Sequence, residues 1–353
     1  MSWSLRIARI GGTDVKVHVT FLLLLGFFWL SGGAAAGLLL LALFGCVLLH
    51  EFGHIGMAAR FGVRTPDVIL LPIGGLARLE RMPEEPKQEF LIAIAGPVVT
   101  LVLAAIFYAW LAFEGRPPEV FPGLRVQSEG FLETLYGINV LLLLFNLLPA
   151  FPLDGGRVLR ALLATRLGLV RATRIAGSVG QMLAFAIGFF ALTTGAILLL
   201  LIAFFIFIGA GSEATAVETR VAGRGLAVRD MMVTDFRTLP IHATLADAAE
   251  ALVAGEQREF PVVDNLGTVE GILTRDDLVR GLAARGGGGL ARDAMSAQTT
   301  EIPPGLSFEE ALELLRASKL PALPVVDGGQ LVGMLTLDNI TDLLLIRRAV
   351  RRT

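Results

Sequence analysis

Three ionisable residues, His50, Glu51 and His54, end a run that is otherwise apolar from Ala34 to Val47. On a helix, the two histidines lie one turn apart on the same face, which suits two imidazoles binding one zinc ion. Glu51 would lie beside them as a base that can deprotonate water. Taken alone, the motif fits equally well a helix whose histidines serve packing. In an apolar membrane helix, however, such groups are costly unless they bind something, so the pattern predicts a metal site.

The composition requires several membrane spans. Of the 353 residues, 54% are hydrophobic, and the mean hydropathy is +0.69. These values are too apolar for an ordinary soluble protein of this length. The formal net charge of −2 gives no reason to expect nucleic-acid binding. The one cysteine, Cys46, has no partner for an internal disulfide and is expected to pack as a small hydrophobe.

Six apolar segments are candidates for crossing the membrane. The last two are short and separated near Gly195, so one long kinked segment is the alternative there. The expected segments cover about residues 18–30, 34–60, 90–113 and 131–148, with two more between 179 and 210.

Two stretches predict β-hairpins. Residues 4–19 alternate in places around Gly11 and Gly12, which indicates a hairpin leading into the membrane. An amphipathic anchor lying on the lipid surface is the alternative. Residues 68–77 read as a strand, a turn at Gly74 and Gly75, and a second strand.

The positions of Lys and Arg predict the orientation. If the N-terminus is cytoplasmic, the opposite side receives only Arg116 and Arg125. Six spans then return the C-terminal half to the cytoplasm, so we expect a multi-pass protein of the cell membrane. The cations on the cytoplasmic side are Arg60, Arg64, Arg78, Arg81, Lys87, Arg157, Arg160, Arg166, Arg171 and Arg174.

A third metal ligand is expected after the fourth apolar segment. Residues 146–156 read NLLPAFPLDGG, in which two prolines and a double glycine interrupt the helix. Irregular backbone at membrane depth is tolerated only where it is buried in protein or lines a cavity. A catalytic zinc usually takes three protein ligands and a water, which makes Asp154 the candidate. The alternative is a plain loop in which Asp154 caps the next helix.

The HEFGH motif (50–54) and residues 146–156 together resemble the site-2 protease family of membrane-embedded zinc metalloproteases. The resemblance covers roughly residues 4–210 and includes the N-terminal hairpin, GGLA at 74–77 and AGP at 95–97. It implies regulated intramembrane proteolysis of a membrane-anchored protein with one zinc ion per chain. Its implied site residues are His50, His54 and Asp154 as zinc ligands and Glu51 as general base, with Asn146 and Pro152 in the family's second motif.

Substrate-binding residues are expected on the second hairpin and the fourth apolar segment. A transmembrane helix must unwind before it is cut, and an extended peptide can pair with a strand edge. Gly74 and Gly75 would let a substrate backbone approach closely, although a structural turn is the alternative. Asn139 lies in the same segment as Asn146 and either faces the cavity or hydrogen-bonds a neighbouring helix.

The C-terminal half contains a repeat. PVVD at 261–264 recurs at 324–327, and GILT at 271–274 recurs as GMLT at 333–336. The repeat resembles a tandem pair of CBS domains, modules that commonly bind adenine nucleotides such as ATP or AMP. The resemblance implies ribose contacts by Thr274 and Asp277 and by Thr336 and Asn339, where asparagine replaces the family's aspartate. A module that dimerises without a ligand is the alternative, and a homodimer through this pair is expected.

The fold class expected is a polytopic α-helical membrane protein with short β-hairpins and a cytoplasmic α/β CBS pair. A transporter or channel regulated by the CBS pair is the main alternative. It is disfavoured because the ionisable groups cluster near the cytoplasmic side, whereas transporters place them at the midplane. An inactive relative is disfavoured by the intact Glu51. The expected boundaries are 1–210 for the protease domain, 211–228 for a linker, 229–285 for the first CBS domain, and 286–353 for the second with its basic tail.

Overall fold

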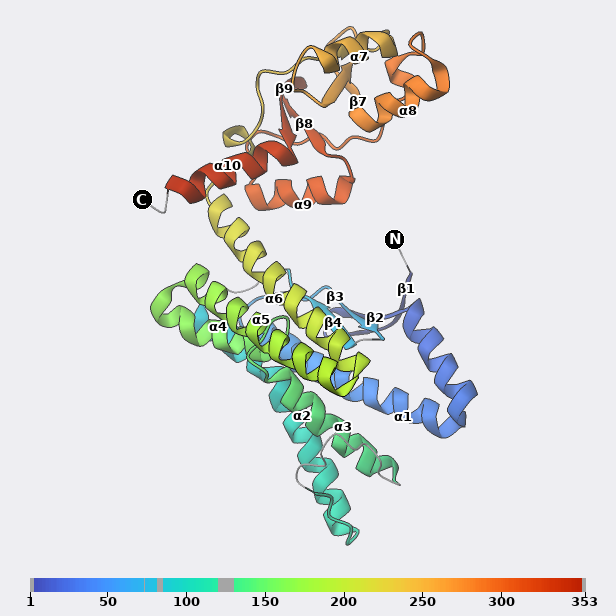
Figure 1. The fold of residues 1–353 in the computed structure, drawn as a ribbon, viewed down its shortest axis with the longest axis vertical. Helices are drawn as coiled ribbons and strands as arrows, with labels where there is room; N and C mark the ends of the chain where they lie inside the picture. Colours follow the sequence, from blue (N-terminus) through green and yellow to red (C-terminus); the bar gives the residue numbers. More distant parts are fainter. Residues whose placement is uncertain (1–2, 73, 81–84, 120–129, 351–353) are drawn as a thin grey trace. The chain divides into compact units, whose positions relative to one another are not determined.

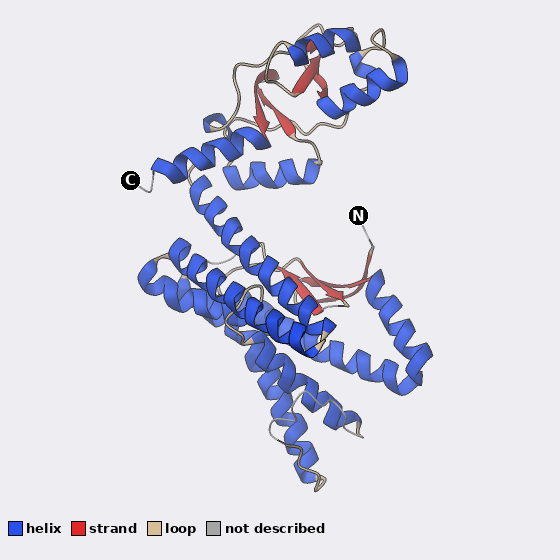
Figure 2. Cartoon of the chain, in the orientation of Figure 1, coloured by secondary structure: helices blue, strands red, loops and turns tan. Residues whose placement is uncertain are grey.

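The computed structural model describes residues 3–72, 74–80, 85–119 and 130–350. The chain divides into two compact units, Met1–Val217 and Glu218–Thr353 (Figure 1). Helices predominate in the described part, and each unit contains its own strands (Figure 2). The first unit has one four-stranded sheet, and the second has a three-stranded and a two-stranded sheet.

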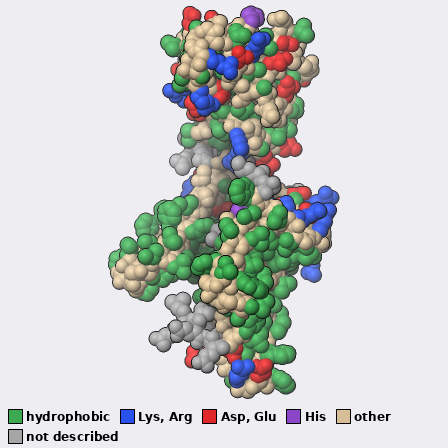
Figure 3. All heavy atoms as spheres, turned by 90° about the vertical axis from the view of Figure 1, so that its right-hand side faces the viewer, with side chains coloured by type: hydrophobic (Ala, Val, Ile, Leu, Met, Phe, Trp, Pro, Cys, Tyr) green, Lys and Arg blue, Asp and Glu red, His purple; other side chains and the backbone are tan. Residues whose placement is uncertain are grey.

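The helices of the first unit are mostly apolar. Among the described residues, four helices are long and apolar enough to cross a membrane, and a fifth apolar helix, α3, is shorter. Hydrophobic side chains cover much of this unit's visible face, whereas charged side chains are frequent on the second unit (Figure 3). The helices are α1 (Val19–Arg60), α2 (Pro86–Phe113), α3 (Phe131–Asn146), α4 (Asp154–Leu167), α5 (Leu169–Thr194) and α6 (Ile197–Gly223).

Helix α1 contains both of the first two predicted segments. It is broken at Gly33, whose φ of 72° lies in the region that glycine adopts at little cost. Phe21 before the break packs edge-on against Phe44 after it, with ring centroids 4.4 Å apart. Val17 and Leu70 from the sheet belong to the same buried cluster, so the sheet is held against both parts of the helix.

The four strands of the first unit are ordered β1-β2-β3-β4. β1 (Ser4–Ile10) and β2 (Thr13–His18) form the predicted N-terminal hairpin, β2 runs parallel to β3 (Asp67–Leu71), and β3 is antiparallel to β4 (Gly74–Arg78). The prediction that Gly74 and Gly75 form the turn is wrong. Both belong to β4, where Gly75 pairs with Leu70, and the turn precedes them. Because β4 is last in the sheet order, it is an edge strand.

Helices α5 and α6 are separate, as the break near Gly195 predicted. Gly195 adopts a left-handed conformation (φ 69°) and caps α5. The alternative of one kinked segment is therefore wrong. Helix α6 continues to Gly223, so residues 211–223 of the expected linker, 211–228, are helical.

The second unit follows the predicted repeat. Each half contains a helix, α7 in the first and α9 in the second. Where the first half has strand β5, the second has only an isolated bridge between Ile302 and Val325. The elements are β5 (Leu239–Pro240), α7 (Leu245–Val253), β6 (Glu259–Val263), β7 (Val269–Thr274), α8 (Arg275–Arg285), α9 (Phe308–Ser318), β8 (Ala322–Asp327), β9 (Gln330–Thr336) and α10 (Leu337–Val350).

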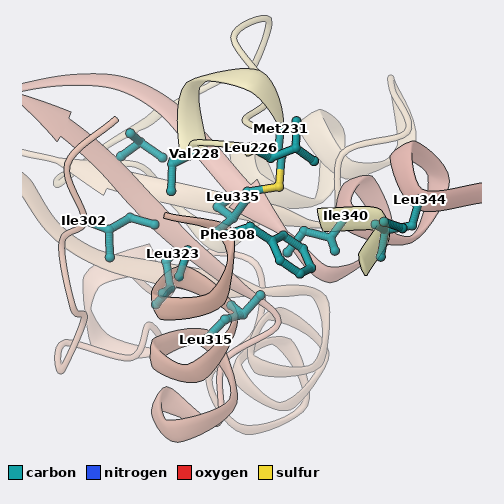
Figure 4. Close-up of a cluster of buried hydrophobic side chains, with 13 residues drawn as sticks. Leu226, Val228, Met231, Ile302, Phe308, Leu315, Leu323, Leu335, Ile340 and Leu344 are labelled. Carbon is teal, nitrogen blue, oxygen red and sulfur yellow. The ribbon is translucent and has the colours of Figure 1, made fainter. Parts of the chain in front are cut away.

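The two repeats are interleaved. Val233, from the start of the first repeat, bridges to Met334 of β9 in the second, and Ser296, from the start of the second, bridges to Ile272 of β7 in the first. The start of the first repeat also contributes to the core of the second (Figure 4). Neither half therefore buries its apolar surface alone. The labelled core residues are Leu226, Val228, Met231, Ile302, Phe308, Leu315, Leu323, Leu335, Ile340 and Leu344.

We predict that Phe308→Ala destabilises the second unit by about 3 kcal/mol or more, because it leaves a cavity in a close-packed core. Phe308 is 1% exposed and fills the space beside Gly223. The control is Leu266→Ala, since Leu266 is 80% exposed. Thermal unfolding of the purified full-length variants measures the difference, and equal melting temperatures for the two would contradict the prediction.

Candidate metal centre

The three predicted ligands lie close together in the first unit. His50 and His54 are buried on α1, and Asp154 is the first residue of α4. The Oδ2 atom of Asp154 lies 3.2 Å from the Nε2 atom of each histidine, and the two Nε2 atoms lie 3.1 Å apart. The arrangement offers two imidazole nitrogens and one carboxylate oxygen to a common point.

Each histidine is held through its other ring nitrogen by α2. The Nδ1 atom of His54 lies 2.7 Å from the backbone carbonyl of Ile92, and that of His50 lies 2.8 Å from the hydroxyl of Thr100. A carbonyl oxygen only accepts, so His54 donates through Nδ1 and keeps the Nε2 lone pair free for a metal. The sequence reasoning missed both partners. The available signal was Thr100, a polar residue in an apolar helix.

Two glycines let α1 and α2 approach closely at the histidines. A Cβ on Gly96 would lie 2.2 Å from His54 Nε2 and 2.7 Å from His50 Nε2. A Cβ on Gly53 would lie 2.7 Å from the carbonyl oxygen of Ala95. Small residues at a crossing of membrane helices allow the backbones into contact. Here they also leave room for the two imidazoles.

Glu51 lies against the edge strand. A Cβ on Gly75 would lie 2.6 Å from Glu51 Cγ, so a side chain at this position of β4 would displace the carboxylate. This contact explains why a glycine stands at position 75 although the residue lies in a strand and not in the predicted turn. Gly74 has a φ of 135° and open space around it. The strand edge therefore runs beside the carboxylate that follows His50.

The remaining residues predicted for the substrate lie on α3 and in the loop before Asp154. Asn139 of α3 is 1% exposed, donates to the carbonyl of Leu135 at 2.8 Å, and has Cys46 of α1 beside it. Asn146 is the last residue of α3 and is partly buried. Pro152 is exposed but contacts α6, since a Cβ on Gly209 would lie 2.6 Å from its Cδ.

The residues predicted to hold nucleotide line two cavities of the second unit. Thr274 and Asp277 line a cavity of about 400 Å³, and Thr336 and Asn339 line one of about 850 Å³. Asp277 accepts from the Thr274 hydroxyl at 2.6 Å, as a cap of α8. Asn339 donates its side-chain N–H to the carbonyl of Met231 at 2.6 Å.

Comparisons with known proteins identify both parts of the chain. Residues 38–128 and 123–190 match peptidase family M50, and residues 228–284 and 291–346 match the CBS domain. A zinc metalloprotease of Methanocaldococcus jannaschii is 30% identical over 350 residues, which cover 96% of each chain. The chain belongs to peptidase family M50, the site-2 proteases. It is a membrane zinc metallopeptidase that carries a C-terminal pair of CBS domains.

Other relatives resemble parts of this protease. Stage IV sporulation protein FB of Bacillus subtilis is 36% identical over 163 residues, which cover 46% of the protease and 52% of that protein. The solved site-2 protease from Methanocaldococcus jannaschii is 35% identical, with a TM-score of 0.46 over 60% of the protease and 95% of that chain. The solved structure of CBSX2 in complex with AMP is 28% identical, with a TM-score of 0.31 over 35% of the protease and 99% of that chain.

The donor set fits the zinc ion that the family implies. Atoms about 2.0–2.1 Å from a tetrahedral zinc lie about 3.3 Å from one another. The donor separations here are 3.1 and 3.2 Å. Two histidines and one carboxylate leave a fourth position open, as in catalytic zinc sites. The contacts of both Nδ1 atoms complete the outer shell that such ligands usually have.

We predict that Gly96→Ala weakens zinc binding by about tenfold or more, because the added methyl group displaces the imidazoles. The control is Gly56→Ala on α1, where a Cβ meets nothing within 4 Å. Zinc content of the purified variants, measured by mass spectrometry, checks the prediction. Equal zinc content in the two variants would contradict the prediction, because it would show that the helix crossing at Gly96 accommodates a methyl group.

Proposed function

We propose that this protease hydrolyses peptide bonds in or near transmembrane segments, with His50, His54 and Asp154 as its zinc ligands. The observation that carries the proposal is the convergence of these three donors in an apolar unit, with 3.1–3.2 Å between the atoms. Unpaired ionisable groups are expensive at membrane depth, and a bound cation would offset that cost.

Glu51 is the proposed general base. A zinc ion held by His50, His54 and Asp154 would supply Lewis-acid polarisation of the scissile carbonyl and a water with a pKa of about 7. Glu51 takes a proton from the attacking water and delivers it to the leaving amine as the peptide bond breaks. Its place next to His50 on α1 and against Gly75 of β4 supports this role.

The proposed substrate site is the free edge of β4. An unwound segment has backbone N–H and C=O groups that a sheet edge can pair, as in β-augmentation. At Gly74 and Gly75 no side chain separates the β4 backbone from a substrate strand, and Glu51 lies beside this stretch. Asn139, Asn146 and Pro152 are proposed to shape the opposite wall of the site.

Glu51→Gln is predicted to retain zinc and to lower the cleavage rate by at least ~10²-fold, because only the base is lost. Asp154→Ala is predicted to lose zinc as well as cleavage, since it removes a ligand. Both are measured on purified protein with a panel of single-span substrates. Zinc-loaded Glu51→Gln that cuts at the wild-type rate would exclude Glu51 as the base.

The proposed topology places the N-terminus and the CBS pair in the cytoplasm. The excess of Lys and Arg in the loops expected on that side supports it. Cysteine labelling from either side of sealed vesicles tests it.

A homodimer through the CBS pair is also proposed, and the exposed apolar side chains Val253 and Val279 support it. Sedimentation of the purified protein tests the dimer.

We propose further that an adenine nucleotide regulates the protease from the smaller cavity of the CBS pair. This cavity contains the start of α8, where the helix dipole favours a phosphate. Four cations line it, against three carboxylates. The cations are Arg258, Arg275, Arg280 and Lys319, and the carboxylates are Glu259, Asp276 and Asp277.

The larger cavity is less suited to a phosphate. Five carboxylates line it, against two arginines, and the amide of Asn339 is already committed to Met231. Burial, together with the carboxylate of Asp338, raises the pKa of Glu259 above its ordinary value. The carboxylates are Asp235, Glu256, Glu259, Asp338 and Asp342, and the arginines are Arg258 and Arg275.

We therefore predict one AMP or ATP bound per chain, measured by calorimetry. Lys319→Gln, which changes only the smaller cavity, is expected to weaken binding by about threefold to tenfold. Asp342→Asn, which changes only the larger cavity, is the matched control and is expected to bind as the wild type does. Two molecules per chain, or an effect of Asp342→Asn alone, would reverse the assignment.

A further inference from the structure

A buried cluster of charges lies outside the metal centre and has no role in the chemistry described above. The guanidinium of Arg160 on α4 is 3% exposed. Its Nε and Nη2 atoms lie 2.6 and 2.5 Å from Glu89 Oε1 on α2. Its Nη1 atom donates to Glu213 Oε1 on α6 at 2.7 Å. The ring of Phe151 lies 5.0 Å below the guanidinium carbon.

Such a cluster is expensive to bury. The attraction between buried charges only partly offsets their desolvation, so a well-packed apolar replacement is often as stable. Stability alone therefore does not account for the buried Arg160–Glu89 pair. What it does add is a fixed geometry, because a planar guanidinium holds its partners in defined directions.

The pair closes a ring of contacts through the metal centre. Asp154 and Arg160 lie on the same short helix, α4. Glu89 lies one turn before Ile92 on α2, and the carbonyl of Ile92 accepts from His54. His54 in turn faces Asp154 at 3.2 Å. The ion pair thus connects the helix that carries the third donor to the helix that orients the histidines.

The second partner, Glu213, connects α6 to the same point. Helix α6 covers the loop before Asp154, with Gly209 against Pro152 and with Ala210 in a buried cluster with Phe151. The Glu213 side chain is 31% exposed, whereas that of Glu89 is 3% exposed. The Glu89 contact is therefore shielded from water, whereas the Glu213 contact is accessible to it.

We propose that Arg160 is a positioning residue, which holds Asp154 at the spacing from His50 and His54 that zinc requires. The inference rests on the proposed metal site, because Arg160 touches none of the donor atoms. It acts through the placement of α4 on α2. Without the guanidinium, Asp154 is free to move away from the histidines as α4 shifts.

The test uses full-length protein with two variants and a control. Arg160→Met combined with Glu89→Leu removes both of the charges that are 3% exposed, so that only the partly exposed Glu213 loses its partner. Arg160→Lys keeps the charge but loses the planar fork. Arg166→Met, an exposed arginine on the same helix, is the control. Zinc affinity is measured by chelator competition, and the visible spectrum of the cobalt(II)-substituted protein reports the coordination geometry.

The double variant is expected to bind zinc about tenfold or more weakly, as outer-shell losses usually do, and to show an altered cobalt spectrum. The zinc affinity of Arg160→Lys is expected to lie between those of the double variant and the control. If the double variant does not fold, Arg160→Lys alone tests the proposal. Wild-type zinc affinity and cobalt spectrum in the folded variants would overturn the proposal. Absence of metal from wild-type protein would instead refute the metal site itself.

Discussion

The structure depends on keeping two imidazoles and a carboxylate together inside an apolar unit. Neutral lipid offers such groups nothing, so each must be oriented and paired by protein. Helix α2 does most of this work. It accepts from His54 through the carbonyl of Ile92, contacts His50 through Thr100, and leaves space at Gly96 for both rings. The crossing of α1 and α2 is thus set by the needs of the site as much as by packing.

The cluster of three proposed ligands was predictable from the sequence, and the residues that support it were not. HExxH places two donors through helical geometry alone, and the interrupted segment at 146–156 identified Asp154 as the third. Thr100, Ile92 and Arg160 act through contacts between helices that lie far apart in the chain. A carbonyl carries no sequence signal at all, and a single arginine in a basic loop is indistinguishable from its neighbours until the fold brings it to Glu89.

The errors in the predicted fold have the same origin. Gly74 and Gly75 were predicted as a turn because glycine pairs usually are, yet both lie in a strand, and Glu51 excludes a side chain at Gly75. The interleaving of the CBS repeats was also invisible. The repeat offset shows that two similar repeats exist. Only the bridges from Val233 and from Ser296 show that the first segment of each repeat pairs with a strand of the other repeat.

The proposed substrate site at the edge strand accounts for the energetic problem of cleaving a membrane helix. Each unpaired backbone group costs several kcal/mol in lipid, so a substrate helix does not unwind without new partners. β4 offers those partners along one side, and Gly75 brings them beside Glu51. In the proposed complex, the strand would compensate for the lost helical bonds beside Glu51, where the scissile carbonyl would approach the metal site. It follows that substrates whose helices are weakened by glycine or proline near the cut are opened at lower cost, because part of their helical bonding is already absent.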